Sequence, residues 1–320
     1  MSKALYRKYR SKKLSEVVGQ KHITTVLENA LKQGKIAHAY LFTGPRGVGK
    51  TSIARILAHE INNLPYSEED NHPDIIEIDA ASNNGVDDIR QLRDNVQVAP
   101  FSAKYRVYII DEVHMLSKAA FNALLKTLEE PPEHAVFILA TTDAHKLPAT
   151  IISRTQRFVF RFISKEDVCS HLEFIAKNEK INISKEAIEI IAERGEGSFR
   201  DSISLLDQIS SITKKNEEIT ANLLEEALGL APKMQINALI SAFENQNSNE
   251  ILQIVRDVRN SGVDLKNFAS QLLSFITENV GEKPYLSQFL MPLTRAEKSN
   301  FIEMELLSIF IQPSFTPHFS

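Results

Sequence analysis

The sequence predicts an α/β protein with a doubly wound parallel sheet in its first half and helical regions in its second. Five short apolar segments of strand length alternate with segments of helical periodicity up to about Ile163. A glycine-rich loop joins the first of these strands to a helix, and strand patterns disappear from Ser164 onward. Strands that alternate with helices are typical of a parallel sheet, because each pair of parallel strands needs a long crossover connection.

Composition narrows the class of protein. The chain of 320 residues is long enough for two or three domains, and 43% hydrophobic with 24% charged residues excludes a disordered chain. A net charge of -4 argues against coating nucleic acid by bulk charge, although it leaves room for local basic patches. Cys169 is the sole cysteine, which excludes an internal disulfide and a cysteine-rich zinc site and favours a cytoplasmic protein. No apolar run approaches the roughly 20 residues of a membrane span, so no membrane partner is expected.

The first forty residues hold a basic cluster and one predicted helix. The basic cluster is interleaved with two tyrosines and comprises Lys3, Tyr6, Arg7, Lys8, Tyr9, Arg10, Lys12 and Lys13. It either contacts phosphates or forms a solvated arm. Apolar residues between Ile23 and Leu31 recur at spacings of three and four, which predicts a helix that buries one face and ends before Gly34.

The first predicted strand runs into a glycine-rich loop. Residues 44–51, GPRGVGKT, fit the pattern G-x-x-x-x-G-K-[ST] at every fixed position, with the apolar strand 40–42 before them and a helix over about 51–60 after them. Glycines let backbone N–H groups approach phosphate oxygens, and the positive end of the helix faces the same anion. We expect Lys50 to neutralise the β and γ phosphates and Thr51 to bind Mg²⁺. The predicted nucleotide-binding residues are Gly44, Pro45, Arg46, Gly47, Val48, Gly49, Lys50, Thr51 and Ser52.

Two more strands carry polar groups at their carboxyl ends. The strand 75–79 leads into the turn 82–85, and a helix is predicted from about Val86. The apolar strand 107–110 delivers Asp111 and Glu112 to the edge where ligands gather in an open parallel sheet. We expect Asp111 to hold Mg²⁺ and Glu112 to polarise the water that attacks the γ-phosphate.

Two further strands complete the predicted sheet. Ser117 is predicted to cap a helix whose apolar stripe covers 121–128, and a pair of prolines ends this helix. The strand 136–140 ends in the polar residues 141–143, where a side chain either senses the γ-phosphate or bonds only locally. The alternating segment 158–162 is the fifth strand.

From Ser164 the apolar residues recur only at helical spacing. Glycine-containing breaks at 195–198 and 229–232 divide this half of the chain. Arg200 lies in the first turn of the helix after the first break. The stripes of the last region are either core or, where exposed, an oligomer surface.

Seven segments together resemble the gamma/tau subunits of bacterial DNA polymerase III, the ATPases of the sliding-clamp loader. They are GPRGVGKTSIAR, EIDAASNNGVDDIR, VYIIDEVHMLS, FNALLKTLEEPPEH, FILATTD, KLPATIISR and GEGSFRDSISLLDQ. The resemblance spans about residues 5–210 and is weaker beyond. It implies an AAA+ P-loop core over 1–163, a small helical lid over 164–228 and an all-α collar over 229–320 that assembles subunits into a ring-like pentamer.

The resemblance also implies roles for single residues. Thr142 falls at the sensor-1 position, Arg154 matches the arginine finger that reaches the ATP of a neighbouring subunit, and Arg200 matches the sensor-2 arginine of the lid. An arginine supplied in trans neutralises transition-state charge, so hydrolysis depends on assembly. With ATP as substrate and Mg²⁺ on Thr51 and Asp111, the implied catalytic set is Lys50, Asp111, Glu112, Thr142, Arg154 and Arg200.

The chain departs from the family pattern at three places. The family commonly carries a four-cysteine zinc module before the strand 75–79, whereas a short polar loop over 62–73 stands here, so we expect no zinc site. Ser11 follows Arg10 where proline is usual, and Thr155 follows Arg154 where cysteine is usual. The chain is also too short to contain the long form's C-terminal extension, which binds polymerase and helicase.

The implied function is ATP-driven loading of the beta sliding clamp onto primed DNA during replication, as part of the DNA polymerase III holoenzyme. The implied partners are the delta and delta-prime subunits, other gamma/tau copies, the clamp and primer–template DNA. Asn83 and Asn84, with Arg90 in the next helix, either contact DNA phosphates or form a plain strand-to-helix turn. Another AAA+ motor of the branch-migration type and a non-hydrolysing scaffold remain the alternatives.

Overall fold

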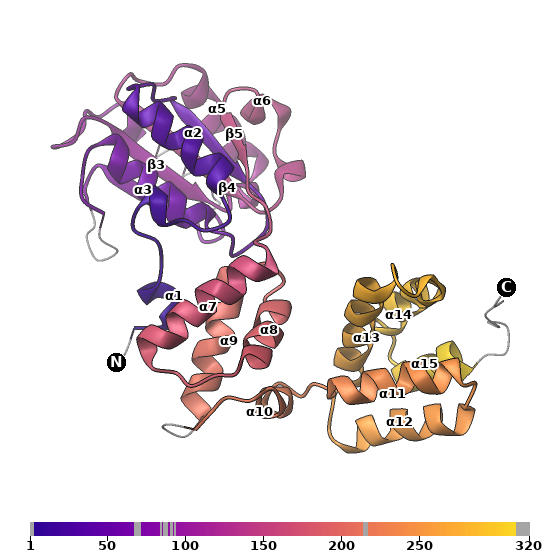
Figure 1. Ribbon diagram of the computed structural model, residues 1–320. Helices are drawn as coiled ribbons and strands as arrows, with labels where there is room; N and C mark the ends of the chain where they lie inside the picture. Colours follow the sequence, from indigo (N-terminus) through magenta and orange to yellow (C-terminus); the bar gives the residue numbers. More distant parts are fainter. Residues whose placement is uncertain are drawn as a thin grey trace. The chain divides into compact units, whose positions relative to one another are not determined.

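The computed structural model describes residues 3–66, 72–83, 85, 89, 92, 94–213 and 217–311. The chain divides into two compact units, Met1–Asn216 and Glu217–Ser320 (Figure 1). The first unit holds both the sheet and the helices that follow it, and the three-domain boundaries expected from the sequence stay a prediction. Within the described residues, none of the helices combines the length and the apolar character that crossing a membrane requires.

A sheet of five parallel strands forms the centre of the first unit, which confirms the predicted α/β class. In spatial order β2-β3-β4-β1-β5, its strands are β1 (Ala39–Thr43), β2 (Ile75–Asp79), β3 (Arg106–Asp111), β4 (Ala135–Thr141) and β5 (Gln156–Val159). Every residue of β1 and β4 is buried, as expected for central strands that are covered on both faces. All five strands are parallel, so their carboxyl ends meet at one edge.

The fifth strand differs from its predicted bounds. It begins two residues before the predicted segment 158–162 and ends at Val159. The alternation itself is present, because Phe158 and Phe160 are buried while Val159 is exposed. The Phe160 N–H still donates to the Thr43 carbonyl at 2.7 Å, so backbone pairing reaches one residue past the strand.

Helices cover both faces of this sheet (Figure 1). On one face, α3 (Lys50–Ile61) packs on β3 and β4, and α2 (Lys21–Lys32) packs on α3. On the other, α5 (Lys118–Glu129) and α6 (Ala149–Ile152) share a hydrophobic cluster with β1, β3 and β4. Ser117 caps α5 as predicted, since its hydroxyl accepts the Ala120 N–H at 3.2 Å. The helix expected from about Val86 lies partly outside the described residues.

Three helices follow the sheet, and the N-terminal segment packs against them. They are α7 (Lys165–Glu179), α8 (Lys185–Arg194) and α9 (Phe199–Ile212), each capped by a serine. The short helix α1 (Leu5–Lys8) lies on α9, where the Leu5 N–H donates to Asp207 at 3.0 Å. The Tyr9 hydroxyl donates to Glu179, which also pairs with Lys8 at 2.6 Å. This part of the basic cluster therefore packs on protein instead of forming a free arm.

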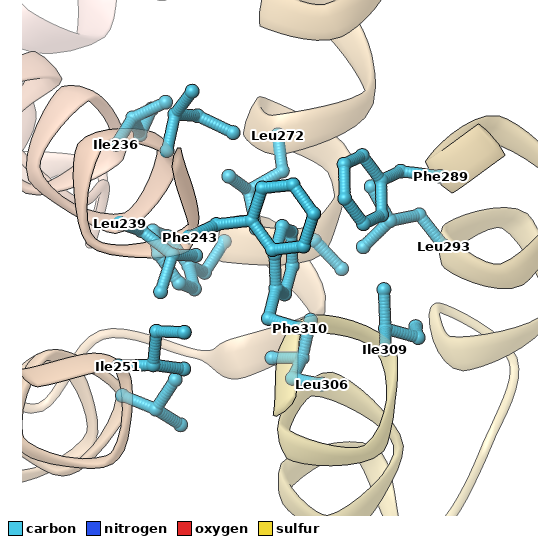
Figure 2. Close-up of a cluster of buried hydrophobic side chains, with 14 of the residues drawn as sticks. Ile236, Leu239, Phe243, Ile251, Leu272, Phe289, Leu293, Leu306, Ile309 and Phe310 are labelled. Carbon is cyan, nitrogen blue, oxygen red and sulfur yellow. The ribbon is translucent and has the colours of Figure 1, made fainter. Parts of the chain in front are cut away.

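The second unit is helical, as the sequence predicts. Its helices are α10 (Ala221–Ala227), α11 (Lys233–Glu244), α12 (Ser248–Asn260), α13 (Leu265–Asn279), α14 (Leu290–Ala296) and α15 (Ile302–Ile311). Figure 2 shows the core of this unit, in which Phe243, Phe289 and Phe310 meet. The Phe289 ring lies 4.8 Å from each of the other two ring centres. These contacts give the second unit a hydrophobic core of its own.

Candidate nucleotide-binding site

The glycine-rich loop connects β1 to α3 and depends on glycine at two close approaches. Gly44 and Gly47 have φ angles of 145° and 73°, in the region that side chains disfavour. A Cβ at Gly44 would lie 2.5 Å from the Phe160 carbonyl oxygen, and one at Gly47 would lie 1.8 Å from the Ser198 hydroxyl. The loop therefore packs directly against the start of α9, which a side chain at Gly47 would prevent.

Lys50 is buried at the start of α3 and folds back over the loop. Its ammonium group donates to the carbonyl oxygens of Gly44 at 2.8 Å and Pro45 at 2.6 Å. Burial lowers the pKa of Lys50, and the nearby Glu112 and Asp111 carboxylates oppose this shift. The amine thus lies within the loop, where the phosphates of a nucleotide are expected.

Thr51 and Asp111 meet at the mouth of the loop. Thr51 comes from the first turn of α3 and Asp111 from the end of β3, and the Thr51 hydroxyl donates to Asp111 Oδ2 at 2.7 Å. Hydroxyl and carboxylate oxygens are ligands that Mg²⁺ prefers. The two predicted metal ligands are therefore adjacent, and their chemistry fits this ion.

Glu112 has an unusual backbone and a fully engaged carboxylate oxygen. Its φ of 46° and ψ of 44° are left-handed, which is uncommon for a residue other than glycine. Its Oε2 accepts the backbone N–H of Thr142 at 3.2 Å and the Thr142 hydroxyl at 3.0 Å. His114 Nδ1 lies 3.3 Å from the same oxygen and 2.9 Å from the Thr141 hydroxyl. Sequence reasoning missed His114, although it stands only two residues after Glu112.

The loop opens onto a pocket whose walls come from several parts of the first unit. Four of the six predicted catalytic residues line it, namely Lys50, Asp111, Glu112 and Arg200. Sequence reasoning did not place the remaining wall, which comprises Tyr6, Tyr9, Arg10, Ser11, Val17, Val18, His171, Phe199 and Ile203. The two tyrosines interleaved in the basic cluster were the one feature of the sequence that could have indicated this wall.

The helices α7 and α9 place the rings of His171 and Phe199 in the pocket wall, and α1 adds Tyr6. The Arg200 guanidinium lies 5.3 Å from the centre of the Tyr6 ring, a cation–π arrangement. The His171 ring lies 4.9 Å from the Phe199 ring. Burial lowers the pKa of His171, which favours its neutral form. The rings of His171 and Phe199 offer flat faces that are suited to stacking against a flat organic ring.

Arg154 lies apart from this pocket. It lines a separate surface cavity, next to Glu129 at the end of α5, and pairs with that carboxylate at 2.8 Å. Thr142 does not line the pocket either, but its hydroxyl donates to Glu112, which does. The fold thus brings five of the predicted catalytic residues into one connected set and leaves Arg154 outside it.

The residues proposed to contact DNA are only partly described. The Asn83 amide donates to the Asp79 carbonyl at 3.1 Å, and Asp79 also accepts from the Ala81 N–H at 2.9 Å. These are local bonds within the turn after β2. Asn84 and Arg90 lie outside the described residues, and a contact with DNA stays a prediction.

The fold of the chain resembles that of a solved structure. RuvB of Thermotoga maritima, described as a Holliday junction branch migration motor, is similar with a TM-score of 0.56 and 23% identity. The similarity covers 73% of this chain and 79% of that chain, and at this identity it shows the fold alone. With a phosphate loop between β1 and α3, paired acids at the carboxyl end of β3 and an arginine from a helical region, the chain is a P-loop protein of the AAA+ ATPase class.

Sequence comparisons then identify the family. Two family models match, "DNA polymerase III, delta subunit" over residues 19–164 and "DNA polymerase III clamp loader subunit, ATPase lid domain" over 167–214. The chain is 44% identical to subunit tau of Bacillus subtilis over 86% of this chain and 51% of that protein. It is 41% identical to subunit tau of Escherichia coli over 85% of this chain and 44% of that protein. The chain belongs to the gamma/tau family of DNA polymerase III subunits.

Shorter relatives match over more of their length. Subunit gamma of Buchnera aphidicola subsp. Schizaphis graminum is 39% identical over 85% of this chain and 78% of that protein. The chain therefore spans about half the length of the tau relatives and most of this gamma relative.

Proposed function

We propose that this chain is the ATPase subunit of a DNA polymerase III clamp loader, which uses ATP binding and hydrolysis to load a sliding clamp onto primed DNA. The observation that carries the proposal is the complete phosphate loop with Thr51 against Asp111, in a chain of this family. The proposed partners are delta, delta-prime, further copies of this chain, the beta clamp and primer–template DNA, in the cytoplasm.

Binding is assigned to the loop and the aromatic wall. Backbone N–H groups of residues 46–51 would hold the phosphates, and Lys50 would exchange its two carbonyl acceptors for phosphate oxygens. Mg²⁺ held by Thr51 and Asp111 would neutralise charge that develops on the phosphates. The rings of Tyr6, His171 and Phe199 would contact the adenine ring of ATP.

Hydrolysis is assigned to Glu112 and its neighbours. Glu112 would orient the attacking water, and Thr142 would bond the γ-phosphate. In this structure the Thr142 hydroxyl donates to Glu112. A phosphate that accepts from this hydroxyl would remove one of the donors on Glu112 Oε2 and so leave the carboxylate more available to water, which links occupancy of the pocket to activation of the general base.

Arg154 is proposed to act on a neighbouring subunit. Its place outside its own pocket supports this arrangement, because an arginine that served its own nucleotide would have to line that pocket. A finger in trans is worth about 10³ to 10⁵ in turnover, so ATP would be hydrolysed only in the assembled complex.

Steady-state ATP turnover tests the proposal. The chain is mixed with its cognate delta, delta-prime and clamp, and primed single-stranded DNA is compared with blunt duplex. We expect turnover to rise only with clamp and primed DNA together, and Lys50→Ala to abolish it. Turnover that ignores the clamp and tracks duplex length would indicate a translocating motor, and no turnover under any condition would indicate a scaffold.

A further inference from the structure

We propose that Glu129 is a positioning residue that orients Arg154 for its action on the neighbouring subunit's ATP. This inference rests on the role proposed above for Arg154. Glu129 is the last residue of α5, whereas Arg154 lies between α6 and β5, so the pair joins two separate elements of the first unit.

Three acceptors bind the two terminal nitrogens of the Arg154 guanidinium. One terminal nitrogen, Nη1, donates to the Thr150 carbonyl at 2.9 Å and to the Ser153 hydroxyl at 3.3 Å. The other, Nη2, donates to Glu129 Oε1 at 2.8 Å. A guanidinium has five N–H groups in a fixed planar fork. Among the described residues, no acceptor takes the other two, one on Nη2 and one on Nε, which leaves them for an anion.

Glu129 is the acceptor that sets the direction of this fork. Thr150 and Ser153 belong to the same turn as Arg154 and move with it. Glu129 projects from α5, whose buried stripe packs in the core beneath the sheet, so it ties the guanidinium to the rigid body of the unit. Thr150 and Ser153 already hold the Arg154 guanidinium against its own subunit. The added effect of Glu129 is therefore to set the direction of the guanidinium, and not to keep it away from the neighbouring subunit.

Because the ion pair between Arg154 and Glu129 is exposed, its effect on the orientation of Arg154 can be tested without a large effect on the stability of the fold. The side chains of Arg154 and Glu129 are 34% and 49% exposed, and an ion pair this open to water contributes little to folding. Removing the Glu129 charge should therefore leave the fold intact. A reacting group that is displaced by about 1 Å can nevertheless lose up to a hundredfold in rate.

Glu130 supplies a matched control. It lines the same surface cavity as Glu129 and Arg154 and carries the same charge. The bonds of the Arg154 guanidinium go to Glu129, Thr150 and Ser153, and not to Glu130. Glu130→Gln therefore repeats the charge change of Glu129→Gln one residue away without touching the fork.

The test compares four variants in the complete complex with clamp and primed DNA: Glu129→Gln, Glu130→Gln, Arg154→Ala and the double variant Glu129→Gln with Arg154→Ala. We expect Glu129→Gln to lower kcat about tenfold, with KM for ATP and the melting temperature unchanged. Glu130→Gln should match the unmodified chain. The double variant should be no slower than Arg154→Ala alone, because Glu129 acts only through the arginine.

Each contrary result has a distinct meaning. A kcat for Glu129→Gln equal to or above that of the unmodified complex, while Arg154→Ala is inactive, overturns this inference alone. A double variant slower than Arg154→Ala also overturns it, because Glu129 would then act by another route. Full turnover by Arg154→Ala removes the arginine from the reaction, and with it the trans mechanism of the proposed function.

Discussion

At Glu112, a single strained residue sits where the chemistry is proposed. A left-handed backbone at a residue with a side chain costs about 1–2 kcal/mol, which the surrounding bonds must offset. The Glu112 N–H donates to Asp111 Oδ1 at 2.9 Å, and its carboxylate accepts from Thr142. Strain of this kind persists where the surrounding contacts over-determine the geometry, as these bonds do at Glu112.

Glu112→Gln should separate binding from hydrolysis. The glutamine oxygen can still accept from Thr142, so the backbone geometry and ATP affinity should be retained. Loss of the basic carboxylate should lower turnover by about 10² or more. A labelled ATP analogue measures affinity, and single-turnover hydrolysis in the assembled complex measures the rate. Near-normal hydrolysis would show that Glu112 is not the base.

Gly47→Ala tests the contact between the loop and α9. Gly47 and Gly34 share a positive φ, of 73° and 65°, but a Cβ at Gly34 meets nothing within 4 Å. In both alanine variants the left-handed backbone lowers the stability by about 1–2 kcal/mol, because alanine has a Cβ. Only Gly47→Ala also collides with Ser198, so it should lower the melting temperature clearly more than Gly34→Ala. Equal losses would mean that α9 moves away freely.

At the scale of elements, local motifs were predictable and long-range contacts were not. The phosphate loop and the acids after β3 were predictable, because a few consecutive residues determine their geometry. The wall formed by Tyr6, His171 and Phe199 was not, since packing of α1 against α9 brings distant segments together. The bounds of β5 were wrong for a related reason, because pairing with β1, and not its own alternation, sets its start.

The entry into β3 depends on a buried carboxylate that sequence reasoning overlooked. Asp74 is 1% exposed and accepts backbone N–H groups from Phe101, Ser102 and Ala103 at 2.6, 2.9 and 2.9 Å. Burial by itself raises the pKa of Asp74, but these three donors outweigh it and the pKa lies below its ordinary value. The charged form thus stabilises the loop that leads into β3.

Asp74→Asn should destabilise the first unit by about 2 kcal/mol at pH 7, because charge-assisted bonds are replaced by weaker ones. The folded-state pKa is depressed, so this stability is present above the unfolded pKa of about 4 and is lost as pH falls through the folded value. Denaturant unfolding at pH 7 and at pH 3 measures the difference. If the difference in unfolding free energy between the unmodified chain and Asp74→Asn does not become smaller at pH 3, the role assigned to the Asp74 charge is contradicted.

At the scale of the whole molecule, each of the two units has buried hydrophobic residues of its own. The site lies entirely within Met1–Asn216, whereas the second unit carries a separate core around Phe289. Helical class was predictable for the second unit from its apolar spacing. Its aromatic cluster was not, because the same spacing fits many ways of pairing the helices.

Phe289→Ala should destabilise the second unit alone. Phe289 is 1% exposed and contacts two further rings, so its loss should cost about 3–5 kcal/mol. We expect calorimetry to show one transition at a lower temperature and a second transition that still rises with ATP. A loss of ATP binding in this variant would show that the two cores are not independent.

Clamp loading itself tests the central claim most directly. Labelled beta clamp, primed circular DNA, delta and delta-prime are incubated with this chain and ATP, and the clamp retained on the circle is counted after gel filtration. The account predicts retained clamp with the unmodified chain and ATP, and none with Lys50→Ala or without ATP. Equal retention with Lys50→Ala, or none with the unmodified chain and its cognate partners, would contradict it.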